Sequence, residues 1–256
     1  MQTIKIDLPE TLKEVEIHTF ADLHIGEAGC DLKGIKEHIK EVAEKENAFA
    51  ILNGDLINNA LKTSISDIYD ETMAPNDEVK KCIEFFEPIK DKILCITSGN
   101  HEDRTKNATS ISPMEFVAAR LGISDKFAPI GAVIFLRFGW NARRKRKQWY
   151  SIYTTHGRGG GRKEGSKANR LAEMASIVDV DIYIHSHTHL PMIIKEGFYR
   201  TDFINSSVSY VDKLFVNTSS MLDYGGYGQV GEFKPNSKHN PIIILDGEKK
   251  AFKAIL

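Results

Sequence analysis

The stretch VEIHTFADLH, residues 15–24, predicts a strand that ends in two side chains able to bind metal. Val15, Ile17 and Thr19 recur with a period of two, which is the period of a β-strand. Asp22 and His24 follow directly after it. In open α/β sheets, ligands bind beyond the carboxyl ends of the strands. The stretch therefore predicts a sheet edge that carries chemistry.

Strand and helix patterns alternate on the carboxyl side of this stretch. Apolar residues at 32, 35, 39 and 42 have the spacing of an amphipathic helix, and Ser112-Pro113 is a typical N-cap and first-turn pair. The expected elements are helices over 32–42, 79–86 and 113–119 and strands at 48–52 and 92–97.

The second half of the chain is richer in strand patterns. Strands are expected at 132–138, 148–154, 181–184, 191–195, 214–217, 242–245 and 251–255, with one helical stripe at 171–178. The first two strands flank a basic stretch and predict a hairpin with a charged tip. Alternation followed by strands suggests two packed sheets with helices outside. No linker divides the sequence, so we expect a single domain over residues 1–256.

The composition excludes several classes of protein. The chain of 256 residues is 41% hydrophobic and 27% charged, as in an ordinary globular protein. No apolar run reaches the ~18 residues of a membrane span, and the amino-terminal residues lack the apolar centre of a signal peptide. Three cysteines without a C-x-x-C pair predict free thiols in a reducing compartment. We therefore expect a cytoplasmic protein with no membrane partner.

Basic residues are concentrated between Arg143 and Arg170. This segment holds ten basic residues and one acid, a formal charge of +9, so that the rest of the chain carries −10. The asymmetry predicts an anion-facing surface on an otherwise acidic body.

Metal-binding residue types follow the predicted strands in five short segments. Their four metal-binding histidines, two aspartates and one asparagine form a mixed nitrogen and oxygen set, which suits Mn, Fe, Zn or Co. Seven ligands exceed what one ion needs and suit two ions ~3.5–4 Å apart, the arrangement used in phosphoryl and phosphodiester hydrolysis. The segments are Asp22-Leu23-His24, Gly54-Asp55, Gly99-Asn100-His101-Glu102, Thr155-His156-Gly157 and His187-Thr188-His189.

The order D-x-H, G-D-x-x-N, G-N-H-E, H-G and H-x-H closely resembles the calcineurin-like metallophosphoesterase superfamily. The resemblance runs from Asp22 to His189, roughly two-thirds of the chain. It implies an α/β fold, a four-layer α/β/β/α sandwich of two mixed sheets with outer helices. It also implies two divalent transition-metal ions, with manganese preferred and iron, zinc, cobalt or nickel as alternatives.

The same resemblance implies a role for each motif residue. A metal-bridging hydroxide would be the nucleophile, and His101 would protonate the leaving oxygen or stabilise charge on the phosphoryl group. The implied ligands are Asp22, His24 and His189 for the first metal, Asp55 as the bridge, and Asn100, His156 and His187 for the second.

Two positions depart from the family pattern. Asn58 stands where members commonly have a carboxylate that orients the residue corresponding to His101, and Ser186 replaces a glycine. Glu102 or Asp103 is a candidate to compensate for the missing carboxylate. We expect His185 to support the site or the core rather than to bind metal.

The basic segment and the run Arg158-Gly-Gly-Gly-Arg162 favour a phosphodiester substrate, either a nucleic acid or a nucleotide, with Arg158 and Arg162 binding phosphate. The alternative is a phosphomonoesterase similar to the protein phosphatases, because Arg104 follows G-N-H-E. The segment after Asp55 lacks the D-R-G of those enzymes. A non-catalytic interaction module is a third reading, and the sequence leaves the oligomeric state open.

Overall fold

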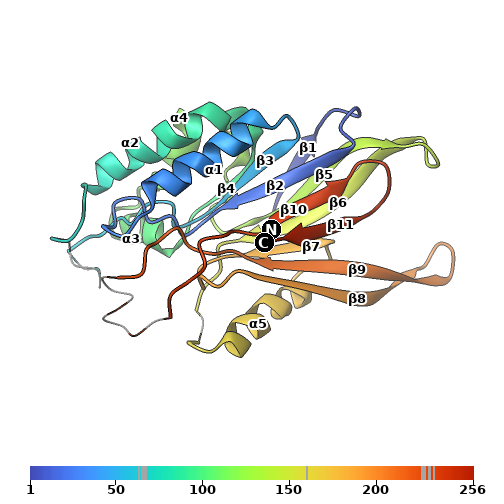
Figure 1. Ribbon diagram of the computed structural model, residues 1–256. Helices are drawn as coiled ribbons and strands as arrows, with labels where there is room; N and C mark the ends of the chain where they lie inside the picture. The colour runs from blue at the N-terminus through green and yellow to red at the C-terminus, as the bar shows by residue number, and fades with distance from the viewer. Residues whose placement is uncertain (63, 65–67, 160, 226–228, 230–231, 233) are drawn as a thin grey trace.

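The computed structural model describes the chain except for residues 63, 65–67, 160, 226–228, 230–231 and 233. Two sheets pack face to face, with helices on both outer surfaces (Figure 1). Within the part of the chain that the structure describes, no helix is long and apolar enough to cross a bilayer.

The five-stranded sheet has the order β11-β10-β2-β3-β4. β2, β3 and β4 run parallel to one another, whereas β10 is antiparallel to both of its neighbours, β2 and β11, so the sheet is mixed. Its strands are β2 (Glu14–Phe20), β3 (Ala48–Asn53), β4 (Ile93–Thr97), β10 (Ile242–Asp246) and β11 (Phe252–Ile255).

The six-stranded sheet has the order β1-β5-β6-β7-β9-β8 and is mixed as well. Hairpins join β5 to β6 and β8 to β9, while β6, β7 and β9 are parallel. Its strands are β1 (Gln2–Asp7), β5 (Ala132–Asn141), β6 (Arg146–Thr155), β7 (Ile182–His185), β8 (Met192–Asp202) and β9 (Ser207–Asn217).

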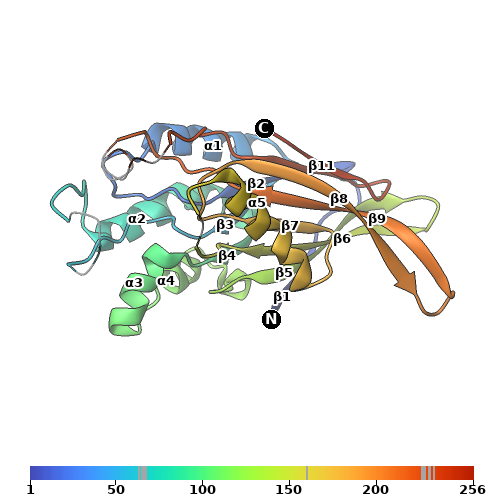
Figure 2. The same ribbon diagram turned by 90° about the horizontal axis from the view of Figure 1, so that it is seen from below.

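The strand period of two divides the interior into separate apolar cores. On β3, Phe49 and Ile51 pack between the two sheets, while Ala50 and Leu52 face the helices. The face toward the helices is covered by α1 (Leu32–Glu44), α2 (Pro75–Phe86) and α4 (Pro113–Arg120). On the outer face of the six-stranded sheet, α5 (Glu164–Ala172) adds Leu171 to a third core (Figure 2). The expected four-layer sandwich is confirmed.

Two elements were not expected from the sequence pattern, and two strands are longer than expected. β1 forms the edge of the six-stranded sheet, and α3 (Asn100–Thr109) begins inside the G-N-H-E motif. β8 and β9 include the strands expected at 191–195 and 214–217 and extend beyond them into a long hairpin. Much of that hairpin is exposed, so its strands lack the apolar alternation that burial imposes. α3 is polar, which likewise removes the apolar periodicity of a helix.

The ends of the sandwich are chemically different. Figure 1 shows α3, which starts at Asn100, at one end, and the turns of the β5–β6 and β8–β9 hairpins at the other. We call these the metal end and the far end. β6 connects them, because it starts at Arg146 in the basic tip and finishes one residue before His156.

Candidate metal centre

The seven predicted ligands come together at the metal end from loops that follow β2, β3, β4, β6 and β7. Ligand atoms of Asp22, His24 and His189 lie within 4.8 Å of one another, and so do those of Asp55, His156 and His187. Asn100 Oδ1 lies 3.3 Å from His156 Nε2. These groups have the same membership as the two sites that the motifs predict.

Asp55 lies between the two groups. It clusters with His156 and His187 on one side and with His24 and His101 on the other, in each case within 4.8 Å. A carboxylate in that position can contact two cations at once, as a bridging ligand requires.

Left-handed backbone is concentrated at the candidate ligands. The φ angle is +51° at Asp22, +49° at His24, +50° at Asp55, +67° at His187 and +55° at His189. Residues other than glycine rarely adopt this region, and such strain clusters at functional sites. The sequence gives no signal for this, because aspartate and histidine are not residues that demand positive φ.

In the group of Asp22, His24 and His189, the atoms that could bind a metal lie close together. Asp22 is fully buried, and its Oδ2 accepts a hydrogen bond from the backbone N–H of His187 at 3.0 Å. Its Oδ1 has no hydrogen-bond partner, although His189 Nε2 lies 3.1 Å away. His24 Nε2 is 3.4 Å from the same His189 nitrogen. A buried carboxylate oxygen facing imidazole nitrogens is a donor set that fits a transition-metal cation.

Electrostatics at the second group favour positive charge. His156 donates from Nδ1 to the backbone carbonyl of Asn53 at 2.8 Å, which directs Nε2 to Asp55 Oδ2 at 3.2 Å. Burial lowers the pKa of His156, but the Asp55 carboxylate outweighs it and raises that pKa to about 10. At His24 burial prevails, and its pKa lies well below the usual value. The hydrogen bond from His156 Nδ1 to a backbone carbonyl is the outer contact typical of metal-binding histidines.

Glu102 holds the Asp55 loop in place. It is buried, and its carboxylate accepts backbone N–H groups from Gly99 at 2.7 Å, Asp55 at 3.0 Å and Leu56 at 2.7 Å. A Cβ at Gly99 would stand 2.1 Å from Asp55 Oδ1, so only glycine fits there. The glutamate of G-N-H-E is thus committed to the backbone, and it does not compensate for Asn58.

The Asn58 side chain, which stands in place of the usual carboxylate, is directed to His24 and not to His101. His101 Nδ1 donates to the backbone carbonyl of Asn58 at 2.7 Å, while Asn58 Oδ1 faces His24 Nδ1 at 3.3 Å. The Asn58 amide nitrogen donates to Glu71 at 2.6 Å and to Glu27 at 3.1 Å. A carboxylate at position 58 would meet those two carboxylates, which explains the amide.

Arg104 is the neighbour of His101 that the motif analysis did not assign to the site. Its Nη2 donates to His101 Nε2 at 3.1 Å and its Nη1 to the Asn58 carbonyl at 3.1 Å. Burial and the Arg104 charge lower the pKa of His101, against the opposing Asp55 carboxylate. The available signal was the i, i+3 spacing on α3, which places both side chains on one helix face. That helix was not predicted.

The predicted phosphate-binding arginines lie on the rim of the metal end. Arg158 is exposed, and its guanidinium pairs at 3.3 Å with Asp103, the other candidate to compensate for Asn58. Arg162 is exposed on the same loop. Gly160, in the middle of the glycine run, lies outside the described residues.

The basic segment does not form one surface. The ten residues of β6 separate its two halves, a span of roughly 30 Å at ~3.3 Å per residue. The basic residues from Arg143 to Lys147 therefore lie at the far end, while Arg158, Lys167 and Arg170 lie at the metal end. The count of basic residues in the segment was correct, but β6 runs from one end of the sandwich to the other and separates these residues into two groups.

His185 is a buried structural side chain, as expected. Its Nδ1 lies 3.0 Å from Asn217 Oδ1, and its ring packs under Gly157, where a Cβ would stand 2.1 Å from Nε2. Ser186, the other departure, is buried and accepts a hydrogen bond from the Asn53 side chain at 2.7 Å.

A two-sheet sandwich with clustered aspartates and histidines at the strand ends is suited to the metal-dependent hydrolysis of phosphate esters. The family model of calcineurin-like phosphoesterases matches residues 16–191. The chain belongs to this family and is therefore a metal-dependent phosphoesterase. No curated protein sequence gives a significant match.

Solved structures with some similarity include a predicted phosphoesterase from Streptococcus pneumoniae, at 13% identity and a TM-score of 0.40, covering 96% of this chain and 99% of that one. Vps29 from Entamoeba histolytica, solved with zinc, has 11% identity and a TM-score of 0.44, covering 94% and 97%. A metallophosphoesterase from Sphaerobacter thermophilus has 12% identity and a TM-score of 0.37, covering 94% and 89%. Similarities of this size carry no information about the substrate.

Proposed function

We propose that the protein hydrolyses phosphodiester bonds in nucleic acids or nucleotides with two divalent cations, manganese being the preferred metal. The position of Asp55 between the two ligand groups carries the binuclear part of the proposal. When bound, such cations polarise the phosphoryl group and lower the pKa of an attacking water toward ~7. The ligands would be Asp22, His24 and His189 at one cation, Asn100, His156 and His187 at the other, and Asp55 at both.

His101 and Arg104 would act on the substrate. His101 Nδ1 donates to a carbonyl and Nε2 accepts from Arg104, so the resting imidazole is neutral. Nε2 lies 3.9 Å from Asp55 Oδ2, and Arg104 Nη2 is therefore at most 7.0 Å from that oxygen. A guanidinium at this range can donate to a phosphoryl oxygen held beside Asp55. If Arg104 donated to the substrate instead, His101 Nε2 would be free to hold a proton for the leaving oxygen.

The exposed Arg158 beside His156 supports the diester reading, because it can bind a phosphate on either side of the scissile bond. A phosphomonoester is the second candidate, and Arg104 is the observation that favours it. A monoester has one more anionic oxygen than a diester, and Arg104 is an extra cation close to where that oxygen would lie.

Protein reconstituted with manganese and assayed on p-nitrophenyl phosphate and bis-p-nitrophenyl phosphate tests the choice. We expect the higher kcat/KM on the diester, with Arg104→Ala reducing both activities. A higher kcat/KM on the monoester, lost selectively in Arg104→Ala, would assign a phosphomonoesterase. If metal-loaded protein hydrolyses neither ester nor any oligonucleotide, the remaining interpretation is a non-catalytic interaction module.

A further inference from the structure

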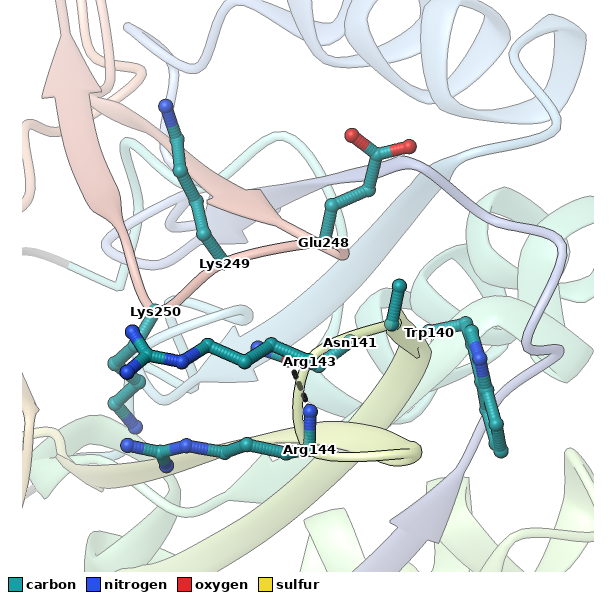
Figure 3. A pocket seen from close by; sticks show the side chains of 8 residues that line it. Trp140, Asn141, Arg143, Arg144, Glu248, Lys249 and Lys250 are labelled. Atoms are coloured by element: carbon teal, nitrogen blue, oxygen red, sulfur yellow. Dashed lines mark hydrogen bonds between the residues drawn. The ribbon is translucent and has the colours of Figure 1, made fainter.

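A cavity lies at the far end, between the β5–β6 turn and the β10–β11 turn (Figure 3). Its volume is about 490 Å³, within the ~300–1,000 Å³ of typical ligand pockets. We call it the far-end cavity. Its lining residues are Trp140, Asn141, Ala142, Arg143, Arg144, Glu248, Lys249 and Lys250.

The cavity has more positive charge than its own acids neutralise. Four cations line it against the single acid Glu248. Of these four, Lys250 pairs with Asp181 outside the cavity at 2.7 Å, and Lys147, in the same basic run as the two arginines, pairs with Asp7 at 2.6 Å. Arg143 and Arg144 make no ion pair with any residue that the structure describes, so their guanidinium groups are available to an anion.

The turn presents both arginines together. Asn141 Oδ1 accepts the backbone N–H of Arg144 at 2.9 Å, which fixes the start of the turn. Figure 3 shows the Arg143 and Arg144 side chains extending in the same direction, toward Lys250. Burial lowers the pKa of Lys250, and the nearby Arg200 and Arg144 charges lower it further, against Asp181. Cations that disfavour one another in this way gain from a shared polyanion.

One exposed aromatic ring belongs to the cavity wall. Trp140 is 46% exposed and lies on the opposite side of the turn from the Arg143 and Arg144 side chains (Figure 3). Cationic groups that contact phosphates and an exposed ring on which a base can stack are the two features of single-strand nucleic-acid binding.

We infer that the far-end cavity binds the phosphate backbone of a nucleic-acid strand, at a distance from the metal centre. A link between this binding and hydrolysis rests on the proposed function, but the binding itself does not. The two ends are about 30 Å apart along β6, which a strand stacked as in duplex DNA, at ~3.4 Å per nucleotide, spans with about nine nucleotides. Short substrates would reach only the metals, whereas longer ones would engage both ends.

The test is fluorescence anisotropy with a labelled single-stranded DNA of about 20 nucleotides in EDTA, where metal-dependent cleavage does not occur, across a salt titration. Arg143→Ala/Arg144→Ala should weaken binding several-fold. The plot of log K against log salt has a negative slope, and the variant should make it less steep by about 1.4, since each single-strand phosphate contact contributes about 0.7. Arg143→Lys/Arg144→Lys should keep most of the slope.

Lys33→Ala/Lys40→Ala is the matched control. It removes the same charge from α1, where the two lysines pair with Glu37 and Glu44, and should leave the slope unchanged. The inference is overturned if the arginine variant binds DNA like the control. It is also overturned if the arginine variant loses affinity only for phosphatidylserine vesicles. The exposed Phe203 and Ile204 of the β8–β9 turn would then mark a lipid-binding face.

Hydrolysis separates this inference from the proposed function. With manganese, the arginine variant should cleave a dinucleotide at the wild-type rate and the longer DNA more slowly. Equal loss on both lengths would contradict a remote site. If wild-type protein cleaves neither DNA, the proposed substrate is wrong, and the anisotropy data alone determine whether the far-end cavity binds the strand.

Discussion

The metal end and the far end of the sandwich hold charge in opposite ways. At the metal end, Asp22 and Asp55 are buried, and backbone N–H groups or imidazoles contact their oxygens. At the far end, Arg143 and Arg144 are exposed and have no acidic partner among the residues described. Burying charge requires fixed partners or a bound ion, whereas exposed charge needs neither. The comparison separates a site built for chemistry from a surface suited to docking.

Asp55→Asn should have the largest effect on the metal end. The change removes the carboxylate charge that both ligand groups share. We expect manganese content, measured by elemental analysis, to fall from two equivalents to one or fewer. Turnover should fall by more than the ~10²–10⁴-fold typical of a lost acid–base group. Full activity of wild-type protein at a plateau of one metal would contradict the binuclear assignment.

His101→Ala should come next. In the proposed mechanism the residue acts on the substrate and does not bind metal, so we expect turnover to fall by ~10²–10⁴-fold while metal content is retained. His239→Ala, an exposed histidine, is the control and should match wild type in both measurements. Loss of metal in His101→Ala would show that the histidine belongs to the ligand set.

Asn58→Leu tests the contact to His24. The variant loses the oxygen that lies 3.3 Å from His24 Nδ1 and leaves Glu27 and Glu71 without their shared donor. Contacts of this kind typically contribute 10–100-fold in metal affinity, and we expect a loss in that range for the cation at His24. A metal titration followed by calorimetry measures it, and unchanged affinity would remove Asn58 from the site.

Glu78→Gln tests the cost of buried charge at the metal end. Burial raises the pKa of Glu78 to about 8. Its Oε2 accepts the Asn59 N–H at 2.7 Å, and its Oε1 has no partner. The pKa of Glu78 is higher in the folded protein than in the unfolded chain. Its contribution to the free energy of unfolding is therefore greatest below the unfolded-chain pKa, and it is lost as the pH rises through the folded-state pKa. Urea unfolding should show Glu78→Gln gaining on wild type from about pH 5 to about pH 9. A pH-independent difference would contradict the raised pKa.

Arg143→Ala/Arg144→Ala should have the smallest effect on the folded protein. Exposed side chains without partners contribute little to stability, so we expect an unchanged urea midpoint. Hydrolysis of bis-p-nitrophenyl phosphate should also equal the wild-type rate, because the turn is about 30 Å from the metal centre. A clear loss of either would mean that the two ends are coupled.

Much of the fold could be predicted from the sequence because its central elements are buried. β2, β3, β4 and α1 lie within a few residues of their expected positions, since the strands are buried between layers and α1 buries one apolar face. The exposed extension of the β8–β9 hairpin and the polar α3 have no such constraint and were not predicted, whereas the buried parts of β8 and β9 were. Without α3, the pairing of His101 with Arg104 could not be predicted.

The sequence by itself determined the kinds of ligand, their order and their places after successive strands, because those depend on neighbours along the chain. Only the tertiary structure decided which atoms meet. Sheet order brings ligands from both sheets to one end, Glu27 and Glu71 turn Asn58 toward His24, and β6 divides the basic segment. The physical reason is that strand direction and sheet order set distances between residues remote in sequence. Local pattern carries no record of either.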